Sequence, residues 1–155
     1  MKTENIVLYA ENSPMQDVVN PGTHQIYRNP RVVLEKRSMD VLQPDAVRVL
    51  MLYGGLCGTD MHLADKDPQT GYIRSSAPAS IPPEGRIIGH EGVGKIIETG
   101  ANIRHVHNGD LITFESIIVC NHCEVCRKGK FNQCQHARLL GLEEDGIFGN
   151  IVDIP

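Results

Sequence analysis

Short apolar runs separated by polar and turn residues dominate this chain, and no long helix-period pattern interrupts them. The runs are rich in Val and Ile, which favours strands over helices. Asn108-Gly109-Asp110 is a turn signal between two of them. Many short strands at this spacing predict a mainly β fold, either a barrel or a sandwich. The strands are expected at residues 6–9, 32–34, 47–52, 87–88, 93–97 and 111–119.

Helix is expected to be a minor component. Residues 59–64 fit a single turn that is capped by Thr59 or Asp60. Two segments with several prolines and few apolar residues, 13–30 and 65–85, are expected to be loops on the surface. Long loops often have a function, so a functional role stays open for both.

The end of the chain, residues 151–155, is strand-like. A strand needs a partner, and further chain is expected where the sequence stops, which suggests a fragment of a longer polypeptide. The acidic turn that leads into this strand, Glu143-Glu144-Asp145, is expected to be a solvated loop.

Composition narrows the class of protein. The 155 residues are enough for one domain with its own core, and 41% hydrophobic with 22% charged residues is ordinary for a soluble globular protein. A net charge of -4 argues against a nucleic-acid partner, because phosphate binding needs clustered Lys and Arg. No apolar stretch is long enough to cross a membrane, and the N-terminus lacks the features of a signal peptide. A cytoplasmic location with reduced thiols is therefore expected.

Four of the five cysteines are close together: Cys120, Cys123, Cys126 and Cys134. Their spacing, C-x2-C-x2-C-x7-C, lets four thiolates surround one centre, and Gly129 allows the return loop to turn tightly. Tetrahedral zinc accepts four thiolates, and such a closed site leaves no position for water. The cluster therefore predicts a structural zinc site.

Other interpretations of this cluster are weaker. A bacterial ferredoxin-type iron–sulfur cluster needs a shorter last gap and a proline after the last cysteine, where this chain has Gln135. Disulfides are disfavoured in a reducing compartment. His122 or His136 could replace a cysteine, but four cysteines already complete the ligand set. The nearby basic residues Arg127, Lys128 and Lys130 are expected to form a solvated loop.

A second group of potential metal ligands lies outside this cluster. Cys57 stands in Gly55-Leu56-Cys57-Gly58-Thr59-Asp60, and His90 and Glu91 follow Gly89. A thiolate, an imidazole and a carboxylate are suitable zinc ligands, and three ligands leave a position for water or substrate, as in catalytic sites. Taken singly, each has a plainer interpretation: a free Cys is usually a small core residue, and a His or Glu at a turn is usually solvated.

These motifs together resemble the N-terminal catalytic domain of the zinc-dependent medium-chain alcohol dehydrogenases, a superfamily with alcohol, sorbitol, threonine and glucose dehydrogenases. The resemblance extends from about residue 32 to residue 155. Gly89-His90-Glu91-x-x-Gly94-x5-Gly100-x2-Ile103 resembles the family's zinc signature, and Cys57-Gly58-Thr59-Asp60 its first ligand motif. The four-cysteine loop resembles its structural zinc loop, and residues 108–111 resemble its Gly-Asp-x-Val turn.

The resemblance implies a partly open, GroES-like β-barrel with few short helices, which would occupy residues 1–155 with a zinc-binding lobe at about 118–136. In the family a second domain with a Rossmann fold binds NAD or NADP. That domain is expected to be absent from this chain, because no complete G-x-G-x-x-G motif is present: Gly92-Val93-Gly94 starts one, but Ile97 stands where its last glycine should be.

The resemblance also implies roles for individual residues at a catalytic zinc. Cys57 and His90 would be ligands, and Glu91 would be a ligand in some states. Asp60 would orient the imidazole of His90, as carboxylates often do for ligating histidines. The remaining family ligand would lie beyond Pro155.

For the chemistry, Thr59 would hydrogen-bond the alcohol oxygen and His62 would pass the proton to solvent. The family oxidises an alcohol, polyol or sugar to a carbonyl through a zinc-bound alkoxide, with hydride transfer to the nicotinamide. The full-length enzyme would be a homo-oligomer, and the fragment a monomer that is inactive alone. The alternative is a non-catalytic zinc-binding structural module that keeps the barrel and the structural metal.

Overall fold

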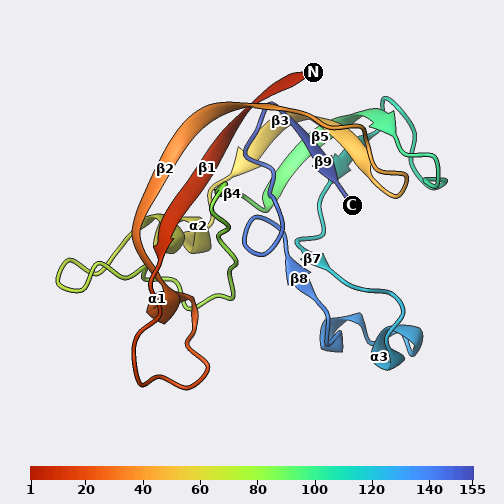
Figure 1. Ribbon diagram of the computed structural model, residues 1–155. Helices are drawn as coiled ribbons and strands as arrows, with labels where there is room; N and C mark the ends of the chain where they lie inside the picture. Colours follow the sequence, from red (N-terminus) through yellow and green to blue (C-terminus); the bar gives the residue numbers. More distant parts are fainter.

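The computed structural model describes all 155 residues, and it confirms a mainly β fold with few short helices (Figure 1). The strands are β1 (Lys2–Asn12), β2 (Tyr27–Ser38), β3 (Val47–Gly55), β4 (Arg86–Ile87), β5 (Glu91–Thr99), β6 (Leu111–Thr113), β7 (Ile117–Ile118), β8 (Arg138–Leu139) and β9 (Ile151–Ile154). The helices are α1 (Thr23–Ile26), α2 (Gly58–Ala64), α3 (Glu124–Arg127) and the 3-10 turn η1 (Phe131–Gln133). None of the helices is long and apolar enough to cross a bilayer.

The strands form three antiparallel sheets that do not close into a complete barrel. Their orders are β2-β1-β4, β6-β5-β3-β9 and β7-β8. Figure 1 shows β1 and β2 as a long curved ribbon beside the sheet of β3, β5 and β9. The segment before β9 joins these two sheets, since Ile6 N donates to Phe148 O (2.7 Å) and Met51 N donates to Asn150 O (3.0 Å).

The alternation of burial along β1 shows why this segment is a strand with one inner face. Thr3, Asn5 and Val7 are buried, and the residues between them are exposed. This period of two places alternate side chains on opposite faces of a sheet. The pairing with β2 keeps one register up to Tyr9, where a bulge shifts it.

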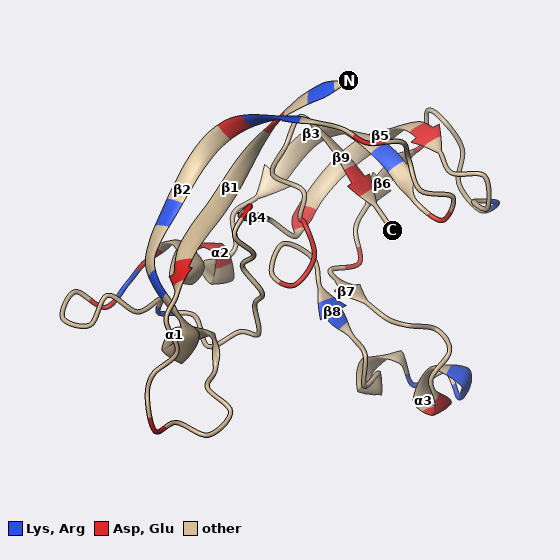
Figure 2. Ribbon diagram, viewed as in Figure 1, with Lys and Arg blue, Asp and Glu red and all other residues tan.

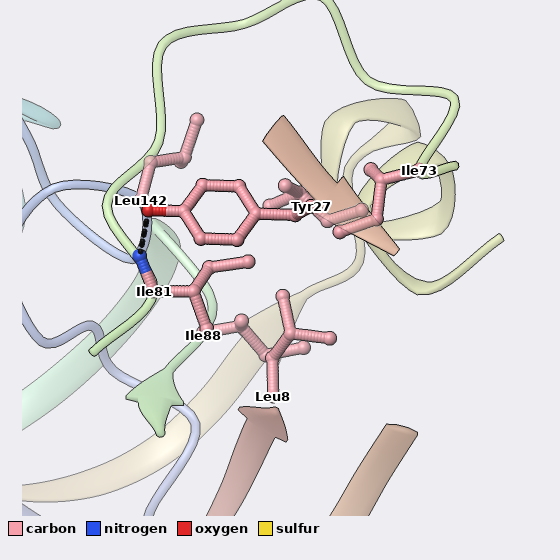
Figure 3. Packing of buried hydrophobic residues seen from close by; sticks show 7 residues of the cluster. Leu8, Tyr27, Ile73, Ile81, Ile88 and Leu142 are labelled. Carbon is pink, nitrogen blue, oxygen red and sulfur yellow. Dashed lines mark hydrogen bonds between the residues drawn. The ribbon is translucent and has the colours of Figure 1, made fainter. Parts of the chain in front are cut away.

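Two hydrophobic clusters form the core. The first, shown in Figure 3, consists of Leu8, Tyr27, Leu63, Ile73, Ile81, Ile88 and Leu142. The second consists of Val47, Val49, Ile96, Leu140, Ile147 and Val152. Phe148 packs against both clusters. The core is therefore continuous across the junction between the two larger sheets.

The segment 65–85 is a loop, as predicted, but it is not a surface excursion. Its side chains Ile73 and Ile81 are 1% and 5% exposed and belong to the first cluster. The hydroxyl of Tyr27 accepts a hydrogen bond from Ile81 N (3.1 Å), drawn as a dashed line in Figure 3. A loop can enter the core here because a buried side chain accepts a hydrogen bond from a backbone N–H of the loop that would otherwise lack a partner.

The prediction of a loop over 13–30 is wrong at its C-terminal end. A short helix occupies Thr23–Ile26, and β2 already begins at Tyr27, so Pro30 lies inside a strand. Proline is tolerated there because β2 is an edge strand and because Asn29, with a φ of 50°, and Pro30 form the bulge opposite Ala10.

The predicted strand over 111–119 is divided into two. Its first part, β6, pairs with β5, and its second part, β7, pairs with β8. The chain changes sheets between them, and β7 and β8 lead into and out of the four-cysteine lobe. The sequence does not reveal this change of sheet, because both parts are rich in residues that favour strands.

The structure adds detail to two expectations about the C-terminal region. The strand β9 does have a partner within the chain, since Val47 to Leu50 of β3 pair with it. The acidic turn 143–145 is only partly solvated: Asp145 accepts hydrogen bonds from Arg86 (3.0 Å) and Ile87 N (3.1 Å), and Glu143 accepts one from Leu139 N (3.0 Å). These carboxylates satisfy backbone and side-chain donors of neighbouring segments.

Candidate metal centres

The lobe between β7 and β8 brings the sulfurs of Cys120, Cys123, Cys126 and Cys134 within 4.8 Å of one another. Cys120 Sγ lies 3.6 Å from Cys134 Sγ and 4.0 Å from Cys126 Sγ. Zinc–sulfur bonds of about 2.3 Å in a tetrahedron place the sulfurs about 3.8 Å apart. All four thiols are free. The sulfur positions therefore fit one tetrahedral ion.

Local backbone structure holds the sulfurs in this arrangement. Cys123 is the residue at the N-terminal cap of α3, and its N–H points to Cys120 Sγ at 3.4 Å. The N–H of Cys120 points to Cys134 Sγ at 3.5 Å. Gly129 has a φ of 72°, so the chain turns back there, as predicted from the sequence. Local hydrogen bonds and the turn at Gly129 thus bring the four sulfurs together.

The thiols differ strongly in their acidity. Backbone N–H donation from Cys126 is the largest of the effects that lower the pKa of Cys123 to about 6. Burial is the largest effect on Cys126, and it raises the pKa of that thiol to about 12. The backbone N–H of Cys120 lowers the pKa of Cys134. A bound cation is what would let all four sulfurs be ionised together.

His122 and His136 lie outside the sulfur cluster. The His122 ring donates from Nδ1 to the carbonyl oxygen of Cys120 (2.6 Å) and is exposed. The two imidazole rings stack on each other, with centroids 6.2 Å apart. The basic residues next to α3, drawn in blue in Figure 2, are exposed, as the sequence predicts.

A second ligand set forms where β3 and β5 meet. The ligand atoms of Cys57, His90 and Glu91 all lie within 4.8 Å of one another, and His90 Nε2 lies 3.9 Å from Glu91 Oε1. Cys57 follows the end of β3, and Glu91 is the first residue of β5. The antiparallel register pairs Gly55 with Glu91. Strand pairing therefore brings together ligands that are far apart in the sequence.

Asp60 lies behind this second set and is 1% exposed. Its Oδ2 accepts a hydrogen bond from Cys57 N (2.9 Å), and its Oδ1 lies 3.6 Å from His90 Nδ1. Both Asp60 Oδ1 and His90 Nδ1 are buried without another partner. A carboxylate facing one ring nitrogen leaves the other nitrogen free for a metal, which is the usual arrangement of a ligating histidine. The residues present therefore fit a zinc ion.

The start of α2 differs from the prediction. The helix begins at Gly58, and Cys57 rather than Thr59 or Asp60 is the cap residue. Asp60 is the third helical residue and reaches back to the N–H of Cys57. Because a side chain at this position can satisfy the free N–H at the cap, the same carboxylate holds the start of the helix and Cys57, a candidate ligand.

Thr59 and His62 both lie on α2. Thr59 Oγ1 is 3.8 Å from Cys57 Sγ, so this hydroxyl is beside the ligand cluster. His62 is exposed and lies outside the cluster. The two residues are one turn apart and therefore share a face of the helix.

Phe148, which contacts the glycines near both ligand motifs, was not predicted from the sequence. A Cβ at Gly89 would overlap the ring of Phe148, and a Cβ at Gly54 would lie 3.1 Å from it. Gly89 directly precedes His90 and has a φ of 93°. The only signal in the sequence was a glycine beside each ligand motif. A glycine lets another side chain pack closely against the backbone, but it does not indicate which side chain that is.

Comparisons with known proteins agree with this geometry. Residues 43–155 match the model of the alcohol dehydrogenase GroES-like domain family, so the chain belongs to that family. It is 33% identical over 121 residues to the L-threonine 3-dehydrogenase of Caldanaerobacter subterraneus subsp. tengcongensis, which covers 77% of this chain and 32% of the relative. It is 31% identical over 109 residues to the D-arabitol-phosphate dehydrogenase of Enterococcus avium, which covers 70% of this chain and 28% of the relative.

Solved structures show the same fold. A Thermotoga maritima protein provisionally assigned as an alcohol dehydrogenase superimposes with a TM-score of 0.88 at 24% identity, over 98% of this chain and 42% of that one. The cobalt- and zinc-bound alcohol dehydrogenase of Pyrobaculum aerophilum gives a TM-score of 0.66 at 19% identity, over 98% of this chain and 39% of that one.

The chain spans about a third of the length of the curated relatives it matches. Those relatives are oxidoreductases, and the domain is the N-terminal, zinc-type domain of the medium-chain dehydrogenases. The family resemblance inferred from the motifs is therefore confirmed.

Proposed function

We propose that this chain is the metal-binding catalytic domain of an NAD(P)-dependent dehydrogenase that oxidises an alcohol, polyol or sugar to a carbonyl compound. The observation that carries the proposal is the cluster of Cys57, His90 and Glu91, with Asp60 facing the imidazole from behind. The cluster offers fewer than four protein ligands, which suits a catalytic rather than a structural zinc.

In this proposal the two ligand sets have different tasks. Cys57 and His90 hold the catalytic zinc, Glu91 is a further ligand in some states, and Asp60 orients His90. When bound, this zinc supplies a Lewis acid that lowers the pKa of an alcohol hydroxyl. The four cysteines of the lobe hold a structural zinc, which keeps a loop folded and takes no part in the chemistry.

Thr59 and His62 provide the proton route. The hydroxyl of Thr59, beside Cys57 Sγ, would accept a hydrogen bond from the alcohol hydroxyl and give up its own proton as it takes the proton of the alcohol. His62 is exposed on the same face of α2 and passes the proton to solvent. A hydroxyl that connects to an imidazole is a common path for proton transfer in enzymes.

The cofactor and the oligomer depend on chain outside residues 1–155. We assign residues 1–155 to the catalytic domain, with the lobe at about 118–136, and NAD or NADP to a Rossmann domain elsewhere in the full-length protein. The relatives' names, and the galactitol-1-phosphate dehydrogenase of Escherichia coli among the similar folds, support a small hydroxylated substrate. The full-length enzyme is a cytoplasmic homo-oligomer in this proposal, and five free thiols suit a reducing compartment.

A second candidate function is a non-catalytic zinc-binding module. The complete four-cysteine set of the lobe supports it, since such a site stabilises a fold without any chemistry. The two candidates differ in how many metal ions one chain binds.

Metal stoichiometry tests the proposal. We expect emission spectrometry to find two zinc ions per chain after incubation with excess zinc and removal of the unbound metal. The variant Cys57→Ser should retain only one, because the lobe is unaffected. One zinc ion in the unsubstituted chain, with no change in Cys57→Ser, would favour the non-catalytic module.

A further inference from the structure

The ring of Phe148 contacts both chain segments that carry the second ligand set. A Cβ at Gly54 would lie 3.1 Å from Phe148 Cε1. At Gly89 no Cβ could be accommodated, because it would overlap the same edge of the ring. Gly54 is in the last part of β3, shortly before Cys57, and Gly89 directly precedes His90. One side chain therefore contacts the backbone just before each of the two ligands.

The backbone around Phe148 fixes the ring in this place. Ile147 N donates to Gly89 O (3.0 Å), and Phe148 N donates to Ile88 O (3.0 Å). The carbonyl of Phe148 accepts from Ile6 N (2.7 Å). The backbone of this segment is therefore bonded both to the turn that carries His90 and to β1.

Two glycines of the same segment approach the same turn. A Cβ at Gly141 would lie 2.5 Å from Gly89 O, and a Cβ at Gly146 would overlap that oxygen. Gly89 is therefore surrounded by residues 141–148, and its φ of 93° is a conformation that favours glycine. Because Gly89 is adjacent to His90, its backbone angles set the direction of the imidazole.

We infer that Phe148 is a positioning residue for the metal ligands Cys57 and His90, an inference that rests on the function proposed above. The ring packs against both the end of β3 and the turn before β5, whose strands are already paired at Gly55 and Glu91. Its loss leaves space into which Gly89 can relax, and a shift of the turn moves His90 relative to Cys57. Metal sites require ligand positions within about 0.5 Å, so a small relaxation weakens binding.

A general packing role would have different consequences. Phe114 is half-buried, as Phe148 is, and it packs against the second hydrophobic cluster, one of the two against which Phe148 packs. Phe114 is not among the nearest neighbours of Gly54 or Gly89. Its truncation to Ala removes the same ring from the same cluster and is a matched control.

Cobalt binding by the chain, with the lobe already filled with zinc, measures the ligand geometry directly. The thiolate-to-cobalt absorption that disappears in Cys57→Ser reports the second site. We expect Phe148→Ala to raise the dissociation constant for cobalt at least about tenfold, as loss of groups that orient ligands commonly does. Phe148→Leu should recover part of the affinity, and Phe114→Ala should leave it unchanged.

The outcomes separate the inference from the proposed function. No Cys57-dependent absorption in the unsubstituted chain would contradict the proposed function itself. Normal absorption there, with the same dissociation constant in Phe148→Ala, would overturn only the positioning role. Equal losses in Phe148→Ala and Phe114→Ala would also overturn it, because packing in general would then explain both.

A second variant covers the case in which Phe148→Ala does not fold. Gly54→Ala keeps the ring and adds a Cβ 3.1 Å from it, which displaces the ring by a few tenths of an ångström. We expect weaker cobalt binding with nearly unchanged thermal unfolding. An unchanged dissociation constant in Gly54→Ala would contradict the positioning role.

Discussion

Asp60 Oδ1 lies 3.6 Å from His90 Nδ1, and both atoms are buried without another hydrogen-bond partner. The other oxygen of the same carboxylate accepts a hydrogen bond from Cys57 N. One buried side chain therefore contacts both residues to which we assign the catalytic zinc. A slight approach of Asp60 to His90 would complete the hydrogen bond when a metal is bound to the opposite ring nitrogen.

Replacing this carboxylate should weaken the second metal site. We expect Asp60→Ala to lower its affinity for zinc or cobalt by about 10- to 100-fold, because His90 loses the group that orients it. The uncapped Cys57 N–H should also lower the free energy of unfolding by about 1 kcal/mol. Competition with a chromophoric chelator measures the first effect, and urea unfolding measures the second.

The matched control for Asp60 is Asp65→Asn at the other end of the same helix. Asp65 pairs with Arg74 at 3.3 Å, but both side chains are about half exposed, so little change is expected. Equal metal affinity in Asp60→Ala and Asp65→Asn would contradict the orienting role of Asp60.

The two metal sites should affect stability differently. Cys126→Ser should remove zinc from the lobe and lower the melting temperature, since binding of a structural metal is coupled to folding. Cys57→Ser should change the melting temperature little, because its site does not hold a loop together. Differential scanning calorimetry with and without a chelator measures the melting temperatures of both variants. Equal decreases in melting temperature would contradict the proposed division of roles.

The ion pairs of Arg48 should anchor the last strand to the sheet. Its side chain is 8% exposed, and its guanidinium donates to both oxygens of Asp153 on β9 (2.8 and 2.9 Å) and to Glu98 on β5 (2.9 Å). We expect Arg48→Ala to lower the free energy of unfolding by about 3 kcal/mol. This is the lower end of the range for removing one partner of a buried ion pair, because both carboxylates are partly exposed.

The control for Arg48 is the exposed pair of Lys36 and Glu4, 3.2 Å apart. Lys36→Ala should change the free energy of unfolding by less than about 1 kcal/mol. Chemical denaturation of both variants gives the comparison, and similar values for the two would show that burial of Arg48 does not matter.

Glu35 should make the stability depend on pH in the acid range. The hydrogen bond from Arg37, with one from the hydroxyl of Tyr9, lowers the pKa of this carboxyl below its ordinary value of 4.5. Because folding lowers the pKa of Glu35, its ionised carboxylate stabilises the folded chain. This contribution to the free energy of unfolding is fully present above the unfolded-state pKa and is lost as the pH falls through the folded-state pKa. The effect should be small, since water reaches the carboxylate.

Thermal unfolding of Glu35→Gln tests this dependence. The variant should melt below the unsubstituted chain at neutral pH, and the difference should vanish in acid below the folded-state pKa of Glu35. A difference that grows towards low pH would contradict the assigned direction.

The sequence by itself determined the class of fold, the family and the four-cysteine site. The lobe could be predicted because its ligands are close in sequence, so their spacing alone limits the geometry to one shared ion. Short β-branched runs likewise predicted most strands, since the residues of a strand are local. The motifs around Cys57 and His90 pointed to the second ligand set only through the family resemblance.

The tertiary structure decided what depends on contacts between distant segments. The register of β3 against β5 brings Cys57 to His90 and Glu91, and the pairing of β9 with β3 gives the last strand its partner. Burial of Ile81 and the place of Phe148 against Gly89 were not predictable either. A single sequence specifies which residues are apolar, but which of them meet is set by close packing of the whole chain.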